Sequence, residues 1–185
     1  MRFKNTLVII LFFALTLGCK EDPLPKPKAM LRLDYKAATF TDFETSNFKF
    51  NFNALSELSS KNEQAITLNY PKMNGSIFIT YKKVENNINK LLTDAQKLSY
   101  EHAAKADGIL PNPFVNKDAK VYGMFYEVSG DAASQSQFYV TDSVNHFLTG
   151  SLYFYAKPNY DSIYPAAMYL QEDIRHIMES LRWKK

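Results

Sequence analysis

The sequence has only one cysteine, Cys19, among its 185 residues. A single cysteine excludes an intrachain disulfide framework and a zinc site built from several cysteines. The three histidines, His102, His146 and His176, share no metal-ligand spacing. The six glycines form no glycine-rich phosphate loop. We therefore expect neither a metal nor a cofactor.

The sequence also lacks an excess of charge of either sign. Its formal charge is +3, and Arg2 and Lys4 of the N-terminal leader supply two of these charges, which leaves about +1 for the mature chain. Nucleic-acid-binding surfaces need a clustered basic field, so this balance argues against a nucleic-acid partner. Aromatic residues are plentiful instead, at 15% of the chain, which favours a sheet rich in Tyr and Phe.

No serine lies in a G-x-S-x-G nucleophile elbow. Asp142, Ser143 and His146 supply the residue types of a hydrolase triad. However, they are neighbours along one turn, and such neighbours do not normally form a triad. The sequence therefore predicts no enzyme.

The leader, residues 1–18, has the pattern of a lipoprotein signal peptide. Arg2 and Lys4 precede an apolar run from Leu7 to Leu17, which suits a secretory signal and is too short for a comfortable membrane span. The run ends in Thr-Leu-Gly-Cys at residues 16–19, which resembles a bacterial lipobox with Thr16 where Leu is usual. We expect cleavage after Gly18 and lipidation of Cys19. The alternative is an ordinary signal peptide with an incidental buried cysteine.

Residues 19–28 read as the lipidated cysteine and a proline-rich tether. Proline stands at every second position from Pro23 to Pro27, a spacing that is incompatible with a helix and gives a short, stiff connection. The charged tract from Lys20 to Asp22 resembles the lipoprotein export tag of Bacteroidetes, although solvation of a linker explains it equally well.

The remaining residues, 29–185, predict a single α+β domain. Alternating apolar and polar residues, or runs rich in aromatic and β-branched residues, indicate strands. The predicted strands are Met30–Tyr35, Phe48–Phe52, Ile66–Tyr70, Ile77–Tyr81, Val121–Val128, Phe138–Thr141 and Phe147–Tyr155. The sequence does not decide whether residues 55–60 form a helical turn or a loop. Pro111–Lys117 reads as a loop, with Phe114 as a candidate partner contact.

Two long helices are predicted, from about Val84 to Ala106 and from about Ser162 to Leu181. Apolar residues recur at helical spacing in both segments. The first stripe runs from Val84 to a partly buried His102, and Asp161 or Ser162 is expected to cap the second helix. Two helices with three consecutive strands between them favour packing onto one mostly antiparallel sheet, on the same face or on opposite faces.

The last predicted strand also supplies a candidate binding surface. Alternation places Leu148, Leu152 and Phe154 on one face of the sheet, and Phe147, Tyr153 and Tyr155 on the other. If one face is open, Tyr153 and Tyr155, together with Tyr126 and Phe147, form an aromatic patch for a partner. If both faces are covered, these side chains belong to the core.

Two long stretches, Tyr70–Ile109 and Val121–Trp183, resemble the gliding motility lipoprotein GldD family of Bacteroidetes. They include YPKMNGSIFITYKK and FYVTDSVNHFLTGSLYFYAKPNY, and the resemblance extends from the Pro23 tether to Trp183. It implies a lipid-anchored cell-envelope protein that gliding and the type IX secretion apparatus require. Other gliding and secretion envelope proteins are the implied partners, and the membrane is reached through the lipid. The outer membrane is favoured, with the leaflet left open.

The resemblance brings no enzymatic activity and no ligand, and Cys19 is the one residue to which it gives a chemical role. An assembly or stabilising component is therefore expected. The alternative is an envelope binding module for a small molecule or a peptidoglycan fragment. The end of the chain, Ile177–Trp183, also looks like the last helix of PsbP/Mog1-like domains.

Overall fold

The computed structural model describes residues 35–101, 105–156 and 159–184, which form ten strands, two α-helices and one 3-10 turn. The elements before the first helix are β1 (Phe40–Glu44), β2 (Phe48–Asn53), β3 (Glu57–Asn62), β4 (Ala65–Tyr70), η1 (Pro71–Met73) and β5 (Gly75–Lys83). The others are α2 (Ile88–Tyr100), β6 (Gly108–Asn116), β7 (Val121–Ser129), β8 (Ser134–Thr141), β9 (His146–Phe154), α3 (Tyr160–Ser180) and β10 (Arg182–Trp183).

Seven strands form one sheet in the order β3-β4-β5-β9-β8-β7-β6, and every neighbouring pair is antiparallel. A second sheet has the order β1-β2-β10 and is also antiparallel. The predicted α+β domain with a mostly antiparallel sheet and two long helices is therefore confirmed.

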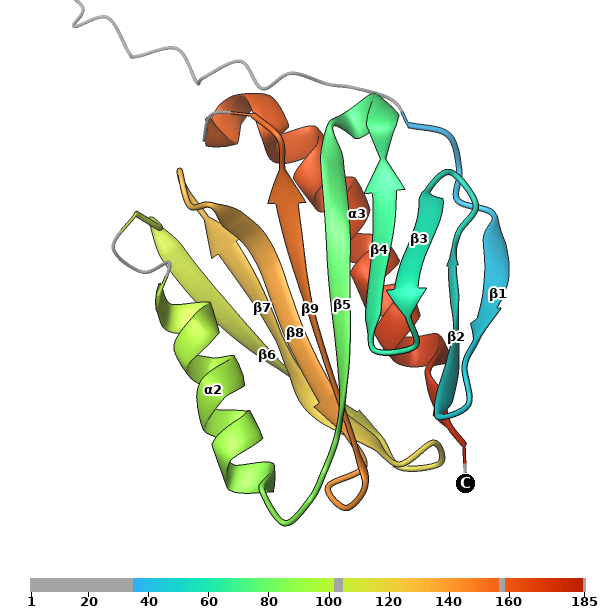
Figure 1. Ribbon diagram of the computed structural model, residues 1–185. Coiled ribbons are helices and arrows are strands. Elements are labelled where there is room, and N and C mark those ends of the chain that lie inside the picture. Colours follow the sequence, from blue (N-terminus) through green and yellow to red (C-terminus); the bar gives the residue numbers. More distant parts are fainter. Residues whose placement is uncertain (1–34, 102–104, 157–158, 185) are drawn as a thin grey trace, which may run out of the picture.

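The two helices lie on opposite faces of the large sheet (Figure 1). Helix α3 and the small sheet cover one face, and α2 lies across the other. The side of α3 that faces the sheet is the predicted apolar stripe, in which Leu170, Ile174 and Ile177 are fully buried. This stripe is long enough to hold the helix against the sheet without any disulfide.

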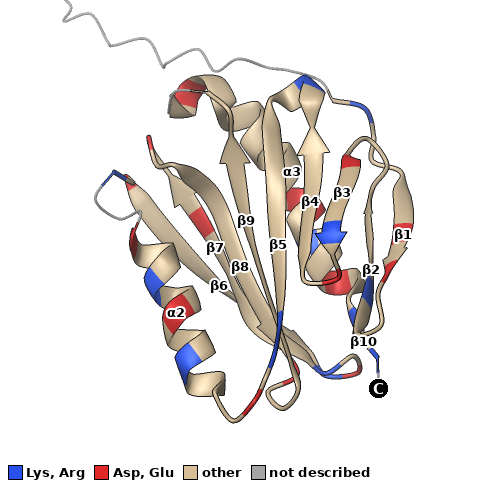
Figure 2. Ribbon diagram, viewed as in Figure 1, with Lys and Arg blue, Asp and Glu red and all other residues tan. Residues whose placement is uncertain are grey.

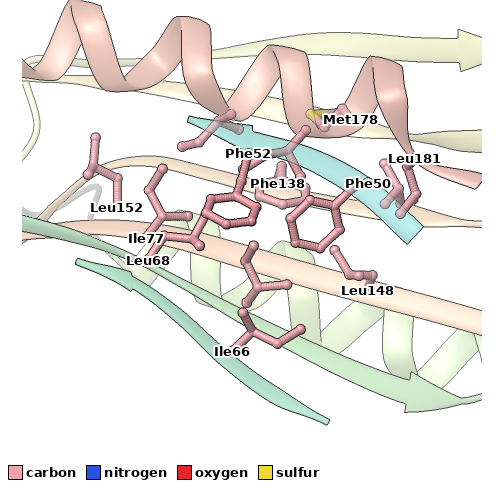
Figure 3. Packing of buried hydrophobic residues seen from close by; sticks show 14 of the residues in the cluster. Phe50, Phe52, Ile66, Leu68, Ile77, Phe138, Leu148, Leu152, Met178 and Leu181 are labelled. Carbon is pink, nitrogen blue, oxygen red and sulfur yellow. The ribbon is translucent and has the colours of Figure 1, made fainter. Parts of the chain in front are cut away.

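The main core lies between the large sheet and the layer formed by α3 and β2. Phe50 and Phe52 of β2 and Met178 of α3 meet Ile77 and Leu152 of the large sheet there (Figure 3). Alternation along β9 sends Leu148 and Leu152 into this core and Phe147 to the opposite face, as the sequence predicts. A second, smaller cluster lies under α2, where Leu91 and Ala95 pack near Phe147.

Residues 111–116 of the predicted loop 111–117 are instead part of strand β6, so this prediction is wrong for all but Lys117. β6 is an edge strand of the large sheet, paired with β7 on one side. Proline cannot donate a ladder hydrogen bond, but an edge strand has one side without a partner, so Pro111 and Pro113 are tolerated. Phe114 is half-buried and packs against the main core, which corrects its assignment as a partner contact.

Two predictions near the N-terminus differ from the structure, and one strand there was not predicted. Residues 30–34 of the predicted strand Met30–Tyr35 lie outside the described residues, and Tyr35 itself is not in a strand. Residues 57–62 form strand β3 rather than a helical turn or loop, and all six are exposed. β1 was not predicted, because its sequence FTDFE has little alternation and its residues are mostly exposed.

Both helices are confirmed, with shifted starts, and α2 ends at Tyr100 rather than at about Ala106. Helix α2 begins at Ile88 rather than Val84, because Asn86 adopts a left-handed backbone conformation with φ of 56° that ends the preceding turn. Helix α3 begins at Tyr160, and neither Asp161 nor Ser162 is its N-cap. Asn159 holds the N-cap position, and the backbone N–H of Tyr160 donates to Asp131 from the β7–β8 connection at 2.9 Å. Neither described helix is long and apolar enough to cross a membrane.

Candidate functional surface

Helix α2 covers only part of its face of the sheet. It lies over the side that contains β6, β7 and β8, and leaves β3, β4 and β5 uncovered on the same face (Figure 1). Strands β4 and β9 carry no Lys, Arg, Asp or Glu, and those of β5 are confined to its C-terminal end (Figure 2). The open part of this face is therefore uncharged over its centre. We call the aromatic residues exposed on it, Phe78, Tyr153 and Tyr155, the tyrosine face.

Phe78 and Tyr153 are neighbours across the β5–β9 pair. Ser76 lies opposite Tyr153, and Phe78 lies opposite Ser151, so the two aromatic rings are diagonal on the same face. Their ring centroids are 5.9 Å apart with an interplanar angle of 68°, an edge-to-face contact. Phe78 is 38% exposed and Tyr153 is half-buried. The pair is thus rigid and still accessible from solvent.

Tyr155 continues the tyrosine face just beyond the end of β9 and is 60% exposed. Its hydroxyl accepts a hydrogen bond from Ser76 at 3.0 Å, and its backbone N–H donates to the carbonyl of Asn74 at 2.8 Å. The side-chain amide of Asn74 in turn donates to the carbonyl of Tyr155 at 2.8 Å. These bonds fix the ring before any partner arrives, which lowers the entropy that binding costs.

The other two predicted patch residues, Tyr126 and Phe147, belong to the core. They are 2% and 1% exposed and pack in the cluster beneath α2. Burial and the neighbouring Tyr139 and Tyr100 raise the pKa of Tyr126 to about 12. The expectation that they share an exposed surface with Tyr153 and Tyr155 is therefore corrected. α2 covers β9 at Phe147 and leaves it open at Tyr153, which alternation along one strand cannot reveal.

Asp142, Ser143 and His146 form a turn rather than a catalytic site. One oxygen of Asp142 accepts the backbone N–H groups of Val144, Asn145 and His146 at 3.0, 2.8 and 2.8 Å. Burial alone would raise the pKa of Asp142, but these three donors and the nearby His146 lower it below its ordinary value. The Nδ1 atom of His146 is 2.8 Å from the Tyr81 hydroxyl, and its ring stacks on Trp183. The Asp142 carboxylate thus accepts hydrogen bonds from the backbone of its own turn.

A polar network that the sequence did not predict lies within the main core. Asp173 is 4% exposed, and both of its oxygens accept hydrogen bonds from the side-chain amide of Asn53, at 3.1 and 2.9 Å. The same amide donates to the hydroxyl of Tyr169, which donates to the carbonyl of Lys36. Burial raises the pKa of Asp173, although Asn53, Tyr70 and His176 oppose the shift. The sequence around Asp173 carries no local signal of this burial, because its partner Asn53 lies 120 residues away.

A cavity of about 490 Å³ adjoins this network. Its wall is formed by the start of the described chain, the β2–β3 turn and η1, and Tyr70 is its most buried lining residue. The Tyr70 hydroxyl lies beside the carboxyl of Asp173 and the side chain of Ser56. Burial and the neighbouring carboxyl of Asp173 strongly raise the pKa of Tyr70, so this group stays protonated.

Among the described residues, no three His, Cys, Asp or Glu side chains are grouped so that they could hold a metal ion. His146 stacks on Trp183, His176 stacks on Phe40, and His102 lies outside the described residues. The lipidation residue Cys19 also lies outside them.

A family model described as gliding motility lipoprotein GldD matches residues 20–183. No curated protein matches the chain.

Proposed function

Because the chain belongs to the gliding motility lipoprotein GldD family, we propose that it is an assembly or stabilising component of the gliding and type IX secretion machinery. In this proposal it acts through contacts with other envelope proteins rather than through catalysis. A lipid on Cys19 holds it at the membrane, with the outer membrane favoured, and the tether of residues 20–28 separates the domain from the lipid.

The observation that carries the contact role is the tyrosine face. An aromatic surface that is rigid, uncharged at its centre and accessible is typical of a protein interface, where Tyr contributes contact area and its hydroxyl keeps a polar partner. Tyr155 supplies exposed area, and Phe78 and Tyr153 supply a preformed aromatic pair. We propose that an envelope partner docks there.

The experiment that tests the anchored role replaces Cys19 by serine in the native host. The thiol of Cys19 is the only acceptor for the lipid, since the sequence has no other cysteine. Cells that express Cys19→Ser should incorporate no labelled palmitate into this protein and should lose gliding and type IX export. The melting temperature of the purified domain should not change.

Pro25→Ser provides a matched control, because it places serine in the same tether and keeps the thiol. This variant should be lipidated and should restore gliding and export. Equal palmitate labelling of wild type and Cys19→Ser would refute the anchoring claim. Full gliding and export by an unlabelled Cys19→Ser protein would show that the anchor is dispensable for function.

A further inference from the structure

The cavity beside η1 has an apolar interior and a charged rim. Leu55, Pro71 and Met73 line it together with Tyr35, and Leu55 is 38% exposed. A cavity of about 490 Å³ with mostly apolar walls has the size and character of a small-molecule site. No residue of the tyrosine face lines it, although Asn74, which is hydrogen-bonded to Tyr155, directly follows the lining residue Met73.

The charges around the cavity fix the orientation of a bound molecule. Lys36 and Lys72 line it and are exposed, whereas the one acidic lining residue is Glu57. Deeper in the protein, the carboxyl of Asp173 lies next to the Tyr70 hydroxyl. An anionic group pointed inward would meet that carboxyl in a poorly solvated environment. An anionic group pointed outward would meet two ammonium groups in water.

We propose that this cavity binds a single-chain anionic amphiphile of the fatty-acid class. Its hydrocarbon chain lies against Leu55, Pro71 and Met73, and its carboxylate lies at the rim between Lys36 and Lys72. Burial of the chain supplies most of the affinity, at roughly 25 cal/mol per Å² of apolar surface removed from water. The two lysines favour a negatively charged head group over a positively charged one.

Decanoate is the probe that tests this inference. The full chain with Cys19→Ser is purified without detergent and titrated with decanoate below its micelle concentration, by calorimetry and by the NMR signal of the Met73 methyl group. We expect saturable binding that shifts this signal. Decyltrimethylammonium has the same chain and a cationic head, and it should bind at least about tenfold more weakly, a difference of 1.4 kcal/mol.

Two variants separate the site from non-specific adsorption. Met73→Trp fills the cavity and should weaken decanoate binding at least tenfold. The pair Lys36→Glu with Lys72→Glu should remove the preference for the anion, whereas Lys61→Glu with Lys82→Glu, two exposed lysines elsewhere on the sheet, should not. Absence of saturable binding, equal binding of both detergents by the unaltered chain, or unchanged binding by Met73→Trp would each overturn the inference. None of these results bears on the tyrosine face or on Cys19.

Discussion

At the residue scale, Asp173 shows how a polar side chain can be kept inside an apolar core. Asn53 donates to both of its oxygens, and the nearby Tyr70 and His176 also favour the charged form, but the residue is only 4% exposed. Burial therefore dominates and raises its pKa. The folded state binds a proton more tightly than the unfolded chain does, so stability falls as pH rises from the ordinary Asp value of 3.8 through the raised value.

Because the raised pKa of Asp173 lowers stability at neutral pH, it leads to a prediction for Asp173→Asn. Asparagine keeps an acceptor for Asn53 and carries no charge, so the cost of burying a carboxylate disappears. At neutral pH we expect the variant to melt a few degrees above wild type, at roughly 2–4 °C per kcal/mol for a domain of this size. The difference in melting temperature between the variant and wild type should become smaller as the pH is lowered towards 4.

Asp94→Asn serves as the control, because Asp94 is exposed on α2. Its melting temperature should follow that of wild type across the same pH range. An Asp173→Asn protein that is less stable than wild type at neutral pH, or that differs from it by the same amount at every pH, would show that the charged form is favoured in the core.

At the element scale, strand β9 divides the α2 face of the sheet into a covered part and an open part. Phe147 is buried beneath α2, and Tyr155 is exposed beyond the other end of the strand. Phe147→Ala should lower the free energy of unfolding by about 3–5 kcal/mol, the usual cost of emptying a buried aromatic site. Tyr155→Ala loses only an exposed ring and one hydrogen bond from Ser76, so it should cost about 1 kcal/mol.

Urea unfolding of both variants measures this contrast, and partner capture from envelopes supplies the second readout. Tyr153→Ala combined with Tyr155→Ala should weaken partner capture while the domain stays folded and keeps its melting temperature to within a few degrees. Comparable losses of stability for Phe147→Ala and Tyr155→Ala would place Tyr155 in the core and remove the basis for the tyrosine face.

How far the sequence predicts these elements depends on whether local pattern or long-range packing decides them. The apolar stripe of α3 and the alternation of β9 are local patterns, and both predictions are confirmed. β6 was misread because its prolines indicate a loop, while its position at the sheet edge makes them tolerable. The burial of Tyr126 depends on where α2 docks, and the burial of Asp173 depends on Asn53, which lies 120 residues away in the sequence.

At the scale of the whole molecule, the layers differ in how much of the large sheet they cover. The small sheet and α3 close the main core on one face, and α2 closes only part of the other. The remaining open surface carries the tyrosine face. A domain that is tethered by lipid and presents one rigid aromatic surface suits an assembly component of the envelope, the role proposed for this member of the GldD family.

The most direct test of that role is site-specific photo-crosslinking in the native envelope. A photoreactive amino acid is placed at position 155 in one strain and at position 144 in another. Tyr155 and Val144 are 60% and 65% exposed, so the two probes are equally accessible, and they lie at opposite ends of β9. If a partner docks on the tyrosine face, we expect one discrete crosslinked envelope protein from position 155 and none from position 144. Equal crosslinking at both positions, or none at position 155 in cells that glide and secrete normally, would contradict it.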